Sequence, residues 1–161
     1  MQLLAIDPGL TCTGWALAES GLFLKVGVAY LTEKQKQGMS LFQRSRRLAS
    51  MLPKCNDGAL IEHMWVSRKQ AANANNLLKT AFLSGYYASR YSSVEMVFPS
   101  QWQPKDYPDG KAGTESWVRD TIGATRSDSL VGHIPRSKRD NAYDAMGMAI
   151  FYANREGLRA R

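Results

Sequence analysis

The architecture of this chain can be built up from one segment, Leu3-Leu4-Ala5-Ile6-Asp7-Pro8-Gly9. Its apolar run indicates a buried strand, which the proline and glycine end in a turn. Asp7 thus stands at the end of a buried strand, where a carboxylate is costly unless a positive group meets it. Ala59-Leu60-Ile61-Glu62 repeats this arrangement, and Asp140 and Asp144 lie one turn apart near the start of an alanine- and methionine-rich helix. The four carboxylates predict a site that holds metal ions against a phosphate backbone.

The flanking patterns predict five strands and four helices. The strands are expected at residues 2–6, 13–19, 22–30, 59–62 and 94–98. The helices are expected at about 39–52, 70–91, 114–122 and 138–155, with polar loops at 99–113 and 123–137. Short turns between the first three strands favour antiparallel hairpins. The sequence therefore predicts an α/β fold, with a mixed five-stranded sheet (three antiparallel strands, then parallel strands) and helices on both faces.

The helical periodicity also predicts which side chains are buried. The last helix is expected to bury Ala142, Ala145, Met146, Ala149, Ile150 and Ala153. The helix at 70–91 carries an apolar face with a seam of small residues, formed by Leu78, Ala81, Phe82, Gly85 and Ala88. The part of this helix around 74–89, with Ala74, Ala81, Gly85 and Ala88, is a candidate dimer surface as well as a core face.

Length and charge limit the kind of protein. A chain of 161 residues predicts one domain over 1–161, and its net charge of +7 suits a polyanion as well as a merely solvated surface. No run of about 20 apolar residues predicts a membrane span, and no secretion signal is recognised, so we expect a protein that is not secreted and acts in the cytoplasm, nucleoid-associated and encoded by a bacterium or phage. Cys12 and Cys55 are expected to be unpaired.

Three motifs carry a family resemblance. Ile6-Asp7-Pro8-Gly9-Leu10 with Thr13-Gly14-Trp15-Ala16 resembles the first motif of RuvC-type Holliday junction resolvases, in the ribonuclease H-like superfamily. Ile61-Glu62 resembles their second motif, and Asp140-Asn141-Ala142-Tyr143-Asp144-Ala145 their last, in matching order across nearly the whole chain. The resemblance implies a ribonuclease H-like fold in which the first and fourth strands are neighbours at the centre of the sheet.

The resemblance also implies a homodimeric endonuclease that cleaves four-way or other branched DNA. Asp7, Glu62, Asp140 and Asp144 would be both its catalytic residues and its metal ligands. Four hard oxygen donors suit two Mg²⁺ ions per site, with Mn²⁺ able to substitute, and hydrolysis would leave a 5′-phosphate and a 3′-hydroxyl. One departure is Asn141, where many bacterial members carry an acid or histidine. Asp140 fits the spacing of the mitochondrial branch, so Asp140 or Asn141 could fill the fourth ligand position.

Five further residues are candidates for contact with DNA. Trp65 could stack on an unpaired base, or it could be a core aromatic. Arg68 and Lys69 could bind phosphates, Lys105 resembles a family lysine near the scissile phosphate, and Lys111 could supply a second positive charge. Each of these cations could equally be solvated.

Other interpretations stay open. Asp7 could be an ordinary turn residue, Glu62 could pair with Arg68 or Lys69, and Asp140 could serve only the helix start. The nuclease could act on RNA–DNA hybrids instead, or the chain could be a junction-binding module without catalysis. A nucleotide-binding role of the actin and sugar-kinase type needs two such domains, so we expect no nucleotide cofactor.

Overall fold

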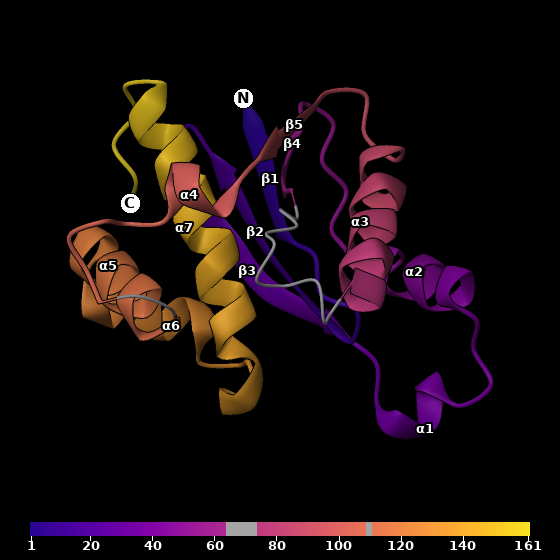
Figure 1. Ribbon diagram of the computed structural model, residues 1–161. Coiled ribbons are helices and arrows are strands. Elements are labelled where there is room, and N and C mark those ends of the chain that lie inside the picture. The colour runs from indigo at the N-terminus through magenta and orange to yellow at the C-terminus, as the bar shows by residue number, and fades with distance from the viewer. Residues whose placement is uncertain (64–73, 109–110) are drawn as a thin grey trace.

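The computed structural model describes residues 1–63, 74–108 and 111–161, which form one five-stranded sheet and the helices around it (Figure 1). The strands are β1 (Gln2–Asp7), β2 (Cys12–Glu19), β3 (Leu22–Tyr30), β4 (Ala59–Glu62) and β5 (Val94–Val97). The helices are α1 (Glu33–Lys36), α2 (Leu41–Ala49), α3 (Ala74–Ala88), α4 (Pro99–Trp102), α5 (Lys111–Ile122), α6 (Ala124–Val131) and α7 (Arg139–Arg155), with a 3-10 helix, η2 (Arg136–Lys138), before α7.

The strand order is β3-β2-β1-β4-β5, which confirms the predicted mixed sheet. β1, β2 and β3 pair antiparallel, whereas β4 runs parallel to β1 and β5 runs parallel to β4. Ile6 pairs with Ile61 in the parallel register. Asp7 and Glu62, each one residue further on, therefore end neighbouring strands at the same edge of the sheet.

The central strand β1 is buried on both faces, because its successive side chains alternate between them. Leu3 and Ala5 pack into one apolar cluster with α7 and the α4–α6 region, and Leu4 and Ile6 pack into a second cluster with α2 and α3. Figure 1 shows these two groups of helices on opposite sides of the sheet. All six residues that we predicted to be buried on α7 are buried.

The core face predicted for α3 is wrong. Leu78 is 66% exposed and Phe82 43% exposed, while the inward side chains are those of Leu77, Thr80, Leu83, Ser84 and Tyr87. Two of these are hydroxyls that turn back onto their own helix: Thr80 donates to the Asn76 carbonyl at 2.9 Å, and Ser84 donates to the Thr80 carbonyl at 3.1 Å. Such bonds satisfy a buried hydroxyl, so the inner face can combine Thr80 and Ser84 with the apolar side chains of Leu77 and Leu83.

The two predicted polar loops contain helices. The segment 99–113 includes α4, and α5 begins at Lys111 rather than at residue 114. The segment 123–137 includes α6, which follows Gly123 at a φ of 88° and buries only Ser127 and Val131. A short helix with so few inward apolar residues has almost no periodic signal.

Cys12 and Cys55 are unpaired. In the part of the chain that the structure describes, no helix has the length and apolarity to cross a membrane.

Candidate active site

Three acidic side chains come together from three separate elements. Asp7 ends β1, Glu62 ends β4, and Asp144 lies in the second turn of α7, which packs across β1 and β2. Asp7 is 7% exposed and Glu62 is 9% exposed. Gly14 makes the approach of α7 close, because a Cβ atom there would lie 1.8 Å from the backbone carbonyl oxygen of Asn141.

The three carboxyl groups influence one another electrostatically. Burial, followed by the charge of Glu62, raises the pKa of Asp7 from its usual 3.8 to about 8. Burial and the charge of Asp144 raise the pKa of Glu62 to about 7, and burial and the charge of Asp7 raise that of Asp144 to about 7. Like charges held close together in a dry site disfavour ionisation. The group therefore retains protons near neutral pH unless a cation offsets the repulsion.

Each of the three acids is held by a neutral donor. The Asn141 amide nitrogen donates to Asp7 Oδ2 at 3.1 Å. The Trp102 indole nitrogen donates to Glu62 Oε1 at 3.2 Å, and the Thr114 hydroxyl donates to Asp144. The sequence did not predict a hydrogen bond from any of these three donors to the acids. Trp102 is 40 residues from Glu62 along the chain and Asn141 is 134 residues from Asp7, so no local pattern connects them.

Asp140 lies at the rim of this site beside Lys111. The Lys111 ammonium is 3.2 Å from Asp140 Oδ2, and the side chain of Asp140 is 43% exposed. The positive charge of Lys111 also lowers the pKa of both Asp7 and Asp144. Lys111 is thus placed next to the acids, as a residue for charge neutralisation would be.

The other predicted site residues have different positions. Lys105 is exposed between α4 and α5, and no contact with the acids is seen within the described chain. Trp65, Arg68 and Lys69 lie outside the described residues. Within residues 1–63, 74–108 and 111–161, no three His, Cys, Asp or Glu side chains are grouped so that they could hold a metal ion as they stand.

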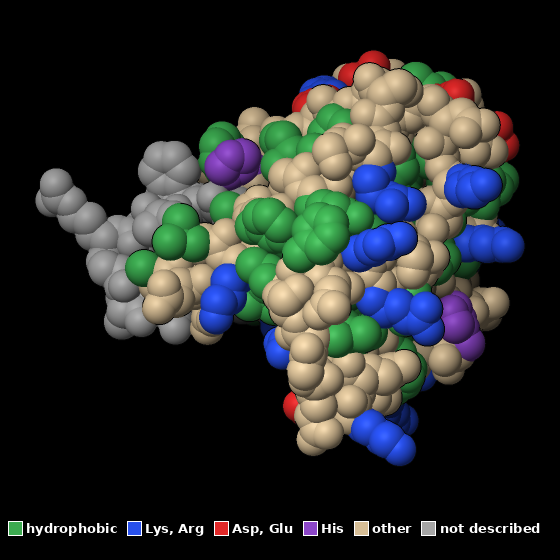
Figure 2. Space-filling model, turned by 90° about the vertical axis from the view of Figure 1, so that its right-hand side faces the viewer, with side chains coloured by type: hydrophobic (Ala, Val, Ile, Leu, Met, Phe, Trp, Pro, Cys, Tyr) green, Lys and Arg blue, Asp and Glu red, His purple; other side chains and the backbone are tan. Residues whose placement is uncertain are grey.

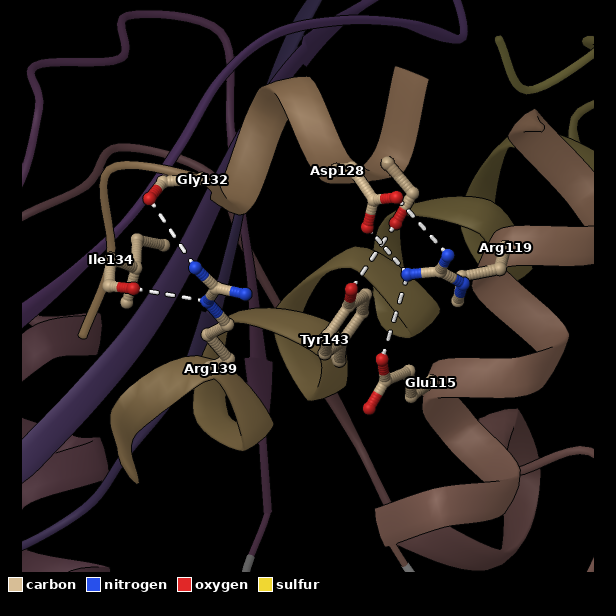
Figure 3. A network of polar contacts seen from close by, with 8 residues as sticks. Glu115, Arg119, Asp128, Gly132, Ile134, Arg139 and Tyr143 are labelled. Carbon is tan, nitrogen blue, oxygen red and sulfur yellow. Dashed lines mark hydrogen bonds and ion pairs between the residues drawn. The ribbon is translucent and has the colours of Figure 1, made fainter. Parts of the chain in front are cut away.

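A polar network joins α5, the helix that carries both Lys111 and Thr114, to α6, and the Ser127 hydroxyl of α6 donates to the Tyr143 hydroxyl of α7 at 3.4 Å (Figure 3). Arg119 of α5 forms a two-point ion pair with Asp128 of α6. A guanidinium nitrogen of Arg119 also lies 3.7 Å from Glu115 Oε1. Arg139 donates to the carbonyls of Ile134 at 3.0 Å and Gly132 at 3.3 Å, which fixes the start of α7.

Two buried hydroxyl groups support the turn after Asp7. The hydroxyls of Thr13 and Tyr87 lie 2.7 Å apart in a buried contact between β2 and α3. The Thr13 hydroxyl also donates to the Gly9 carbonyl at 3.3 Å. The turn that follows β1 is therefore linked to α3 through buried hydroxyls.

The strand order and the covering helices are those of a ribonuclease H-like fold, which the family resemblance implied. The chain resembles the Thermus thermophilus RuvC structure, with 17% identity and a TM-score of 0.51 over 100% of both chains. It also resembles the yeast mitochondrial Holliday junction resolvase Ydc2, with 15% identity and a TM-score of 0.54 over 98% of this chain and 81% of that one. A third similar structure is T. thermophilus RuvC in complex with a Holliday junction substrate, with 15% identity and a TM-score of 0.49 over 100% of this chain and 99% of that one. No protein-family model and no curated protein matches the sequence.

Proposed function

We propose that the protein is a single nuclease domain that cleaves Holliday junctions or other branched DNA with the help of divalent metal ions. One observation carries this proposal: Asp7, Glu62 and Asp144 meet at one edge of the sheet and raise one another's pKa. The fold supports it, because the chain shares its architecture with RuvC and with Ydc2, whose name describes a Holliday junction resolvase.

The donor set suits Mg²⁺ or Mn²⁺ by its chemistry. Hard carboxylate oxygens are the ligands these ions prefer, and a cation would relieve the repulsion among the three buried acids. Asp7, Glu62 and Asp144 would hold the metal, with Asp140 joining them once its contact with Lys111 is released. The bound ions would supply an activated water and charge neutralisation at the scissile phosphate, leaving a 5′-phosphate and a 3′-hydroxyl.

The surrounding residues would orient the acids and the DNA. Asn141 and Trp102 each hold one carboxylate in place by donating a hydrogen bond to it. Lys111 would turn its ammonium from Asp140 to the phosphate. We assign the remaining DNA contacts to Lys105 and to three residues outside the described part of the chain. Of these, Arg68 and Lys69 would bind phosphates. Trp65 would stack on a base, and such stacking contributes about 1–3 kcal/mol to binding.

The outer face of α3 is the surface through which we propose that two chains form a homodimer. Figure 2 looks onto this side of the molecule and shows hydrophobic side chains gathered on it. Leu78 and Phe82 are exposed there, Tyr86 packs against both Phe82 and Phe42, and Gly85 leaves open space above the helix. A two-fold dimer would present two sites to the two equivalent strands of a junction.

Cleavage of a labelled four-way junction tests this function. The wild-type protein should cut the junction symmetrically in Mg²⁺ and not in EDTA. Asp7→Asn should lower the cleavage rate more than about a hundredfold while junction affinity stays within about twofold, because it removes a metal ligand and not the basic surface.

Asp57→Asn is a matched control for that variant. Asp57 accepts a hydrogen bond from the backbone of Gln2, at the opposite end of β1. Cutting by Asp7→Asn at the wild-type rate would reject the site. Cutting of RNA–DNA hybrids alone would favour a different nuclease, and junction binding without nicking in Mg²⁺ would favour a binding module.

A further inference from the structure

We propose that the exposed basic side of α1 and α2 binds the phosphate backbone of a DNA duplex arm that leads away from the acidic site. We call this surface the α2 basic face and define it by the exposed Arg46 and Arg47, with the half-buried Lys36 and Arg44 beside them. The inference deepens the proposed function, since it gives the nuclease a DNA contact distinct from the five residues assigned above.

The charged residues in the segment around α2 are all positive. Residues 34–54 contain Lys34, Lys36, Arg44, Arg46, Arg47 and Lys54 and no acidic residue. Glu33, just before them, forms an ion pair with Lys36. Figure 2 shows Lys and Arg side chains gathered to the right of the hydrophobic patch on the side of the molecule that carries α2 and α3.

The amphipathic pattern of α2 turns two arginines outward. Ser45, Leu48 and Ala49 are buried against the sheet, and Arg46 and Arg47 are exposed. These two arginines line a shallow hollow of about 290 Å³ together with Gln43, Ser50 and Met39. Among the described residues neither arginine forms an ion pair, so both guanidinium groups are available to a ligand.

The α2 basic face is continuous with the turn that follows Asp7. The Arg44 guanidinium donates to the carbonyls of Lys36 and Met39, both at 3.1 Å, and so fixes the link between α1 and α2. Lys36 and Arg44 line a second hollow of about 220 Å³ with Thr11, Gln37 and Glu33, the acid that pairs with Lys36. Thr11 lies between β1 and β2 and accepts a backbone hydrogen bond from Leu31 at 3.3 Å. A duplex that reaches the acids past this turn would run on along α2.

The chemistry of the surface fits a phosphate backbone. Guanidinium groups present fork-shaped donors to phosphate oxygens, and each phosphate contact releases a counterion. Such contacts fix the position of DNA without reading its sequence. We therefore expect the α2 basic face to contribute equally to the binding of a junction and of a plain duplex.

Equilibrium binding in EDTA tests the inference without any cleavage. Arg46→Gln combined with Arg47→Gln should weaken binding to both a four-way junction and a linear duplex by about tenfold. The slope of log affinity against log salt concentration should fall by about two, since two phosphate contacts are lost.

The matched control is Arg159→Gln combined with Arg161→Gln, which removes the same charge beside the β2–β3 turn at Gly21, at the other end of the sheet from Asp7. It should change affinity less than about twofold. Arg46→Lys with Arg47→Lys, which keeps the charge, should retain most of the salt slope and so separates charge from folding.

Unchanged affinity and salt slope in the Arg46 and Arg47 double variant would overturn the inference, and so would losses equal to those of the control. Retained DNA binding with lost binding to a poly-glutamate peptide would assign the surface to acidic proteins instead and would also overturn it. A protein that binds DNA through α2 but never cuts a junction in Mg²⁺ would uphold the inference while contradicting the proposed nuclease.

Discussion

Asn141 shows how a neutral side chain can serve a group of acids. Its amide nitrogen donates to Asp7 Oδ2 at 3.1 Å and lies 3.4 Å from the Cys12 carbonyl oxygen. The hydrogen bond lowers the pKa of Asp7, against the effects of burial and of Glu62. A carboxylate at position 141 would add repulsion to a site that already disfavours charge. Asn141 is therefore best understood as a residue that positions Asp7.

Loss of this amide should slow cleavage. We expect Asn141→Ala to reduce the single-turnover rate of junction cleavage by about 10- to 100-fold, as removal of a residue that orients a metal ligand usually does. The apparent Mg²⁺ requirement should rise in parallel, which a purely structural defect would not cause. Asn154→Ala, at an exposed position of the same helix, is the control. Wild-type rates and Mg²⁺ dependence in Asn141→Ala would contradict this role.

At the scale of elements, the outer side of α3 is apolar, and its inner side mixes apolar residues with hydroxyls. Its inner side carries hydroxyls that bond within the fold, including Tyr87 to Thr13 at 2.7 Å. Its outer side carries Leu78 and Phe82, both exposed. A monomer would leave this apolar surface in water, and this exposed surface is what supports the homodimer proposed above.

A charge on the outer face of α3 should separate the two chains. Phe82→Glu is expected to weaken self-association at least tenfold, because it would bury an unpaired carboxylate in the contact. Sedimentation over a concentration series measures this. Leu24→Glu, at a similarly exposed apolar position on β3, should leave the mass unchanged. A wild-type protein that stays monomeric at all concentrations would rule out the dimer.

For the whole molecule, the raised pKa values make stability depend on pH. Asp7, Glu62 and Asp144 have folded-state pKa values of about 8, 7 and 7, against 3.8, 4.5 and 3.8 for the free groups. Between about pH 4 and 8 the native state therefore binds more protons than the unfolded chain. The free energy of unfolding of the metal-free protein then falls as pH rises through this window.

Urea unfolding in EDTA should show this dependence directly. The midpoint for the wild-type protein should be lower at pH 8 than at pH 5, whereas Asp7→Asn should have a flatter profile, since it removes one of the titrating acids. Mg²⁺ added at pH 8 should raise the wild-type midpoint, because a ligand of the native state stabilises it. Parallel pH profiles for the two proteins would contradict the electrostatic link.

Several of these features could be predicted from the sequence, because they follow local periodicity. The runs before Asp7 and Glu62 mark buried strands, and the alanines of α7 mark its inner face; all are observed. The short helix α6 and the inward hydroxyls of α3 were not predictable in this way, since their patterns are polar. Trp102 beside Glu62 depends on packing between distant segments, which no spacing along the chain reveals.

The separation of Asp7 and Asp144 along the chain has a consequence for synthesis. A ribosome needs roughly 7 to 27 seconds to add the residues between them, at about 5–20 residues per second. Until α7 emerges, Leu3 and Ala5 of β1 lack the helix that covers them, and the first carboxylate has no partner from the last one. The proposed metal site therefore cannot form on the nascent polypeptide until α7 has been made, and chaperones have time to shield its uncovered central strand.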